Sequence, residues 1–317
     1  LGGAPVRVGD GGFELQMLSM HLTLLAYDVS LSLDDSSVVV PEASAVFEPG
    51  ALLRFVPSEI RFSGAELDLT IGEDGASTAP AGLLAVLAGP AMNDGAIIER
   101  SRQLRVDSSS FTLRSEDPAL APFSFGEVEL EVMMAADGTF VASFDGRRLS
   151  GKGPGGRISV AAIGDAGSMD MRLDVKVDDF RLAALSPFLP QLPEALSDIG
   201  STSGNANVML TAGKIVAADI DMVALGGRLD LSPAGLPVLE YDTASVIMEY
   251  KGETGSLVLA QGELALADGR TLALSGDVDA LHGPTPQLAF RFRGNRWPIE
   301  QILSLIHISE PTRPLYI

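Results

Sequence analysis

Few residues of this 317-residue chain could act as a nucleophile, a general base or a metal ligand. The absence of cysteine excludes thiol catalysis, disulfide bonds and cysteine-ligated metals. A hydrolase needs a base beside its nucleophile, and that base is most often histidine. His21 lies in a strand-like run, His282 lies in a proline-containing turn, and no Gly-x-Ser-x-Gly elbow occurs. We therefore expect that the chain is not an enzyme.

Carboxylates and glycine-rich loops give no stronger signal for chemistry. None of the 42 acidic residues stands in an apolar, aromatic setting that would raise its pKa, as a glycosidase acid requires. Gly9 to Gly12 lacks the acidic spacing of a calcium loop, and neither Ser nor Thr follows Lys152 in the loop Gly151 to Gly156. We expect no metal and no cofactor. A glycan-active enzyme stays open as a third hypothesis, and it would need an aromatic-lined cleft with two facing carboxylates.

The net charge of −20 and the sequence pI of about 4.4 argue against nucleic-acid binding, which depends on Lys and Arg. The 46% hydrophobic content predicts a folded chain. No segment reaches the ~18–20 apolar residues of a membrane-spanning helix. The chain begins at Leu1 without a signal-peptide pattern, so we expect a mature domain or a missing N-terminus.

Apolar and polar residues alternate along most of the chain, most regularly from Met169 to Val177. Successive side chains of a β-strand point to opposite faces, so this run predicts a strand with one dry face. Asp-Gly pairs, which are typical of tight turns, separate such runs at 74–75, 137–138, 145–146 and 268–269. The spacing predicts an antiparallel sheet. Further strand-like runs include 29–33, 60–62, 67–71, 104–106, 111–113, 128–132, 246–250, 257–259, 264–266, 272–274 and 288–292.

The sequence has few helical signals and one candidate boundary between modules. Short helices are expected at 51–56 and 83–88, and a Pro-rich helical insert is expected at 180–199. The flexible loop Gly151 to Gly156 is the best candidate boundary. We therefore expect one β-module at 1–150 and a second at 151–302.

The last residues follow a different pattern. Leu303 to Arg313 resembles the translation of a transposon-end adaptor that is used in sequencing libraries. We expect the natural sequence to stop near Ile302, and we treat 303–317, with His307, as a non-native tail.

Three stretches carry a resemblance to a known family. The first, 40–75, has a short apolar helix, then Pro57 to Gly64, then a strand that ends in Asp-Gly. The second, 177–210, places Leu185-Ser-Pro-Phe-Leu-Pro190 and Gly200-Ser-Thr-Ser-Gly204 before a new strand. The third is the Trp-Pro segment 292–298. In order and spacing they resemble the AsmA-like superfamily, and most closely its YhdP-type central region.

The resemblance implies a periplasmic protein that an N-terminal helix outside this chain anchors to the inner membrane. It implies a long, curved, taco-like β-sheet whose concave face is apolar. Such proteins are thought to carry phospholipid between the inner and outer membranes of the Gram-negative envelope, in outer-membrane biogenesis. The family contributes no catalytic residues.

We therefore expect phospholipid or another acyl lipid to contact alternating residues of the strands. A non-catalytic secreted or surface β-sandwich for adhesion or envelope assembly is the alternative, in which the apolar faces would pack against each other. The expected lipid-binding residues are Leu67, Leu69, Ile71, Val128, Leu130, Val132, Met171, Leu173, Val175, Leu257 and Leu259.

Overall fold

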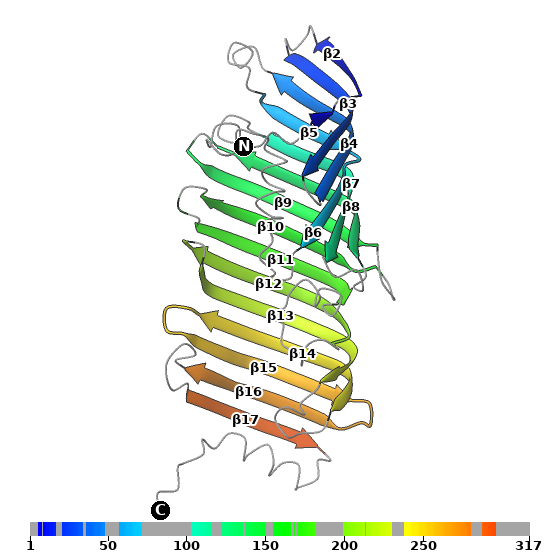
Figure 1. The fold of residues 1–317 in the computed structure, drawn as a ribbon. Coiled ribbons are helices and arrows are strands. Elements are labelled where there is room, and N and C mark those ends of the chain that lie inside the picture. The colour runs from blue at the N-terminus through cyan, green and yellow to red at the C-terminus, as the bar shows by residue number, and fades with distance from the viewer. Residues whose placement is uncertain are drawn as a thin grey trace, which may run out of the picture. The chain divides into compact units, whose positions relative to one another are not determined.

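A computed structural model shows a mainly β protein; the residues that it describes form seventeen strands and no helix (Figure 1). The described residues are 6–7, 9–16, 21–33, 36–47, 57–71, 103–115, 122–135, 137–149, 155–165, 168, 170–181, 199–212, 214–229, 238–279 and 287–295. They fall into two compact units. The boundary lies between Val175 and Lys176, within strand β11 (Asp170–Arg181).

Unit 1 is a sheet in which most neighbouring strands are antiparallel. β2 pairs with β3, β3 with β4, and β7 to β10 follow one another in order, while β1 pairs with β3. β5 and β6 both pair with β4 and both lie parallel to β7. The strands are β1 (Val6–Arg7), β2 (Asp10–Gln16), β3 (His21–Leu33), β4 (Ser36–Phe47), β5 (Glu59–Ser63), β6 (Glu66–Ile71), β7 (Gln103–Ser115), β8 (Phe123–Met134), β9 (Thr139–Arg148) and β10 (Arg157–Asp165).

Unit 2 is a simpler meander. From β12 onward each strand pairs antiparallel with the next along the chain. Its strands are the end of β11, β12 (Ser201–Thr211), β13 (Lys214–Leu229), β14 (Leu239–Lys251), β15 (Ser256–Leu266), β16 (Thr271–Asp279) and β17 (Gln287–Asn295).

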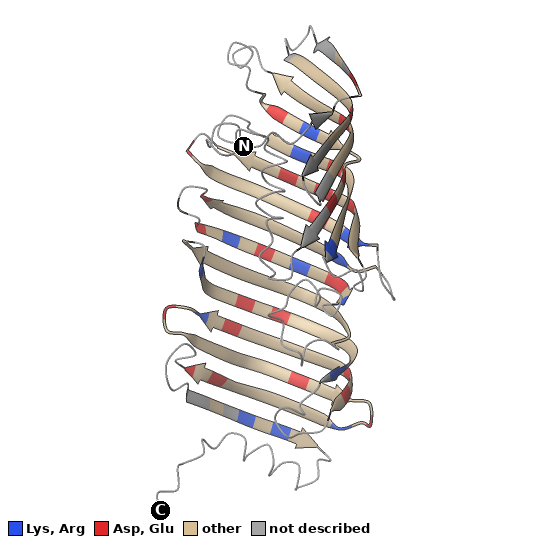
Figure 2. Cartoon of the chain, viewed as in Figure 1, with Lys and Arg blue, Asp and Glu red and all other residues tan. Residues whose placement is uncertain are grey.

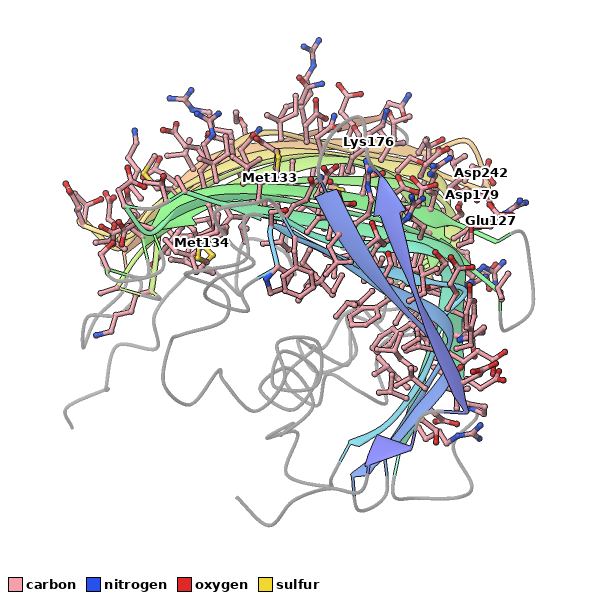
Figure 3. The ribbon with its side chains drawn as sticks, turned by 90° about the horizontal axis from the view of Figure 1, so that it is seen from above. Glu127, Met133, Met134, Lys176, Asp179 and Asp242 are labelled. Carbon is pink, nitrogen blue, oxygen red and sulfur yellow. The ribbon has the colours of Figure 1, made fainter. Side chains whose placement is uncertain are left out.

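The strands of each unit are bent along their length, so each unit has a concave face and a convex face (Figure 3). We call these the inner face and the outer face. In β8 the side chain of Met134 lies on the inner face and that of Met133 lies on the outer face. Lys176 of unit 2 lies on the outer face.

The bend coincides with residues whose φ is positive and with interruptions of the strand register. In unit 1 these are Ser108 in β7 and Glu127 in β8, with φ of 50° and 52° and register shifts beside both. In unit 2 they are Asp179 and Gly226, with φ of 49° and 58°. An extra residue of this kind bends a strand and increases its local twist.

The buried core sits largely on the inside of these bends. In unit 1, Val38, Val40, Ala65, Leu67 and Val106 form a buried cluster that spans the bend. In unit 2 the corresponding cluster is Ala224, Leu239, Tyr241 and Leu266. Bending brings inner-face side chains from both sides of the corner into contact, so one sheet layer buries part of its own apolar surface.

The curved, mainly antiparallel β-fold is confirmed, with two differences in detail. The pairing of β5 and β6 with β7 is parallel. The turn expected at Asp145-Gly146 is wrong, because both residues lie inside β9, opposite Ser159 and Ile158. Asp145 accepts hydrogen bonds from Arg157 and Ser159 of the next strand, which holds it in the ladder.

Several expectations fall on residues outside the described ranges. They are the helices at 51–56 and 83–88, most of the insert at 180–199, the turn at 74–75, His282 and the tail at 303–317. The expected module boundary at 150/151 stays a prediction.

Candidate functional site

The regular run in β11 has one apolar and one charged face, as its sequence predicts. Met171, Leu173 and Val175 are half-buried on the inner face, and Val177 is buried. Asp170, Arg172, Asp174 and Lys176 are exposed. Figure 2 shows the charged residues of β11 as bands separated by uncharged positions.

Neighbouring strands of unit 1 bring the other expected residues to the same kind of surface. Leu130 of β8 lies between Val106 of β7 and Phe144 of β9, and Val132 lies between Leu104 and Ala142. Val128 and Leu67 are buried near the bend, at 5% and 7% exposure. The side chains of Leu69 and Ile71 lie outside the described part of β6.

Unit 2 presents a comparable apolar surface around Leu257 and Leu259. Leu257 lies between Tyr250 of β14 and Val278 of β16, and Leu259 lies beside Met248. Both leucines are half-buried. The expected residues for which the side chain is described therefore all lie on an inner face. The structure does not test whether they bind lipid.

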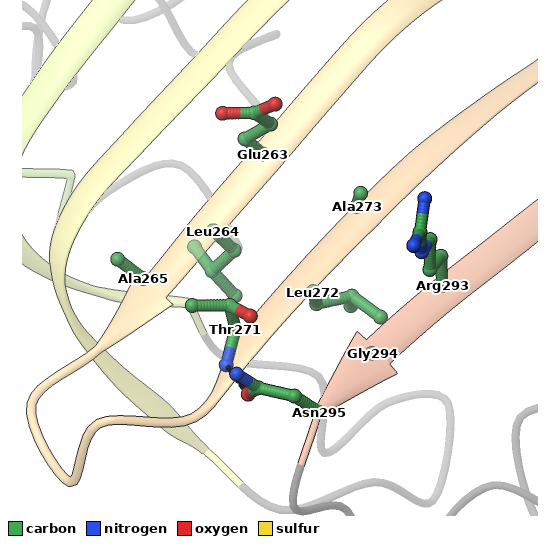
Figure 4. Close-up of a pocket in the computed structure, with 9 residues that line it drawn as sticks. All are labelled: Glu263, Leu264, Ala265, Thr271, Leu272, Ala273, Arg293, Gly294 and Asn295. Carbon is green, nitrogen blue, oxygen red and sulfur yellow. Dashed lines mark hydrogen bonds between the residues drawn. The ribbon is translucent and has the colours of Figure 1, made fainter.

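One open pocket lies within unit 2, at strands β15 to β17 (Figure 4). Its volume of about 460 Å³ is within the range of small-molecule sites. Leu264 and Leu272, which lie opposite each other, contribute apolar surface. Glu263 and Arg293 line it as well, and the Thr271 N–H donates to Asn295 Oδ1 at 2.9 Å. Because side chains alternate along a strand, Leu264 and Leu272 lie on one face of the sheet, and Glu263 and Arg293 lie on the other.

Ion pairs between neighbouring strands stabilise the outer face of unit 1. Arg61 Nε lies 2.5 Å from Asp107 Oδ2, Arg114 Nε lies 2.8 Å from Asp68 Oδ1, and Arg157 Nε lies 2.7 Å from Asp145 Oδ1. The hydrogen bond from Arg157 to Asp145, with the charge of that carboxylate, raises the pKa of the guanidinium. These charges pair with each other across strands, which is the ordinary role of a solvated sheet face.

The other three groups with a shifted pKa lie in two hairpin turns and at one strand end. Hydrogen bonds from the side chain and backbone of Thr139 lower the pKa of Asp137, and the backbone N–H of Arg270 does the same for Asp268. A hydrogen bond to Glu249 raises the pKa of Lys251. The hydrogen bonds that cause these pKa shifts stabilise turns and strand ends. None of the four groups with a shifted pKa, which are these three and Arg157, faces the apolar surface.

Two inner-face features of unit 1 were missed from the sequence. Phe123 and Phe125 pack edge to face with centroids 4.9 Å apart, and Phe111 and Phe144 lie 6.4 and 6.1 Å from Phe125. Arg148 is 3% exposed and lies across from Phe125. Alternation along 139–148 would have placed Phe144 and Arg148 on one face, but the Asp-Gly pair at 145–146 suggested a turn there.

No described residues form a group of three or more His, Asp or Glu side chains that could hold a metal ion. In the described ranges there is also no helix long and apolar enough to cross a membrane. Comparisons of the chain with protein-family models, with curated proteins and with solved structures found no match.

Proposed function

We propose that this chain carries acyl lipids, and phospholipid in particular, along the apolar inner faces of its strands. The observation that supports the proposal most directly is the position of Met171, Leu173 and Val175. They share the inner face of β11 and remain half-buried, whereas their polar neighbours face outward. Such partly exposed apolar side chains offer contact to acyl chains along successive strands.

The hydrophobic effect is large enough for this task. Each methylene removed from water contributes about 0.8 kcal/mol, so burial of a 16-carbon chain contributes roughly 12 kcal/mol. Because these contacts are non-directional, strands with similar aliphatic side chains hold a chain with similar strength at each step. A lipid can therefore move from strand to strand without a deep free-energy minimum.

The resemblance to the AsmA-like superfamily supports a cellular setting for this transfer. We propose that the chain belongs to a periplasmic, inner-membrane-anchored protein of this type, which moves phospholipid between the inner and outer membranes. In this proposal the chain has no catalytic role. The fold, with curved sheets and an apolar concave face, agrees with the one that the resemblance implies.

Identification of bound lipid tests the proposal. The chain would be purified without detergent and extracted, and the extract would be analysed for phospholipid by mass spectrometry. We expect phospholipid in amounts that approach or exceed one molecule per chain. A surface β-sandwich for adhesion would give a lipid-free protein, and that result would contradict the proposal.

Crosslinking distinguishes the two faces. A photo-reactive residue at Leu173 should form lipid adducts in cells, because Leu173 lies on the inner face. The same residue at Asp174, which is the adjacent exposed position of β11, is the matched control and should form few adducts. Adducts at neither position, or at both equally, would count against lipid transfer on the inner face.

A further inference from the structure

Arg148, the last residue of β9, is an exception on the inner face of unit 1. It is the only charged residue among the described ones that is buried, with 3% of its surface exposed. It follows Phe140, Ala142, Phe144 and Gly146 on the same face of β9. The described inner-face positions of unit 1 are otherwise uncharged.

The two strands beside Arg148 surround it with different chemistry. On one side Phe125 of β8 lies directly across from it, and Phe123 packs edge to face against Phe125. On the other side Gly156 contributes no side chain, and its carbonyl accepts the Arg148 backbone N–H at 2.8 Å. The position thus combines a cation, an aromatic neighbour and a neighbour without a side chain.

A guanidinium in this setting suits a phosphate group. It has five N–H donors in a planar fork that matches phosphate oxygens, so contacts with the protein and with an anion can coexist. Charge-assisted hydrogen bonds of this kind are stronger away from water. Apolar side chains around the cation would at the same time hold the acyl chains of the same molecule.

We propose that Arg148 binds the phosphate of a phospholipid whose acyl chains lie on the inner face of unit 1. This inference rests on the proposed lipid-carrying function and adds headgroup selection to it. The site makes unit 1 selective for phosphate-bearing lipids, while the remaining inner face contacts any acyl chain of suitable length.

A competition between two lipids tests the assignment. The delipidated chain would be incubated in neutral detergent micelles with equal amounts of phosphatidylglycerol and of diacylglycerol with identical acyl chains. Bound lipid would then be quantified by mass spectrometry. We expect about a tenfold preference for phosphatidylglycerol, and Arg148→Met should reduce it to near one without lowering diacylglycerol binding.

Arg147→Met is the matched control. Arg147 precedes Arg148, lies on the outer face and pairs with Glu127 at 3.7 Å, so its removal changes the net charge equally. It should leave the preference unchanged. An equal fall in both variants would show a general effect of charge and would overturn the assignment to Arg148.

The remaining outcomes are also decisive. Binding of both lipids without preference by the unmodified chain overturns this inference and leaves the proposed function intact, whereas binding of neither lipid overturns both. Oleate, which carries a carboxylate in place of the phosphate, would be added as a third competitor, and a preference for oleate over phosphatidylglycerol would overturn the phosphate assignment. If Arg148→Met does not fold, Arg148→Lys serves instead: loss of the planar fork should lower the preference about threefold, and an unchanged preference contradicts the proposal.

Discussion

The two units use the same alternation but stabilise their sheets differently. The inner face of unit 1 carries an aromatic cluster around Phe125, and arginine–carboxylate pairs connect the strands on its outer face. The inner face of unit 2 also carries aromatic residues, such as Tyr241 and Tyr250, but small residues such as Gly204, Ala218 and Gly262 lie between its larger side chains. Its outer face is more sparsely paired: its described ion pairs, such as Lys251–Glu249, join residues two positions apart.

This difference indicates that alternation determines which face of a strand is apolar but does not determine how stable the sheet is. Large aromatic rings and cross-strand charge pairs add stability at particular places in unit 1. A face on which small residues lie between larger ones has less side-chain contact between strands, so its sheet depends more on backbone pairing. Under the proposed function, unit 1 is the firmer and more selective part, and unit 2 is the less selective part.

The largest expected effect is the loss of the central aromatic ring. Phe125→Ala should destabilise unit 1 by about 3–5 kcal/mol, because it removes contacts with Phe111, Phe123 and Phe144 and leaves a cavity. Hydrogen exchange measured by mass spectrometry would localise the loss to β7–β9. Phe292→Ala, at a position 43% exposed on β17, is the control and should change protection little. Equal losses in both variants would remove the distinction between the units.

The next largest expected effect on stability comes from a substitution at the bend of unit 2. Gly226 in unit 2 has a φ of 58° with open space around the position of a Cβ, so Gly226→Ala introduces backbone strain without a clash. We expect a loss of about 1–2 kcal/mol in the free energy of unfolding of unit 2. Denaturant titration would measure it. Gly12→Ala, also in open space but without a positive φ, should not destabilise unit 1.

Cross-strand charge pairs contribute less. Asp107 contacts both Arg61 and Arg105, so Asp107→Asn should cost unit 1 about 1 kcal/mol at low salt and less at high salt. Asp221→Asn in unit 2 relieves repulsion with Asp219 on the same face of β13 and should not destabilise. Thermal unfolding at two salt concentrations would compare them. Equal, salt-independent losses would contradict the contrast between the outer faces.

The smallest effect should be common to both units. Asp137 and Asp268 each have a pKa lowered by hydrogen bonds within a hairpin turn, so their ionised forms are stabilised by folding. This stabilisation is present above the ordinary carboxyl pKa of about 4 and is lost as the pH falls through the lowered values. The protection factors of the amides in both turns, corrected for the pH dependence of intrinsic exchange, should therefore fall at acid pH. Asp137→Asn should remove this response from its own turn alone.

Much of the fold could be predicted from the sequence because successive side chains of a β-strand point to opposite faces, so apolar and polar residues alternate. The face assignments of Leu130, Leu173 and Leu257 follow from alternation once each strand is recognised. Strands that contain turn-like residues could not be recognised in this way. Asp145-Gly146 resembles a turn, but ion pairing of Asp145 with Arg157 keeps it within β9.

The sequence by itself determined that the chain is made of strands with one apolar face. The local alternation of side chains is sufficient for that conclusion. Only the tertiary structure decided how the strands pair, where they bend and which side chains meet. Register joins residues of neighbouring strands, such as Phe111 with Phe125 and Arg148 with Gly156. Register for this reason places Arg148, the last residue of β9, opposite Phe125 on the inner face.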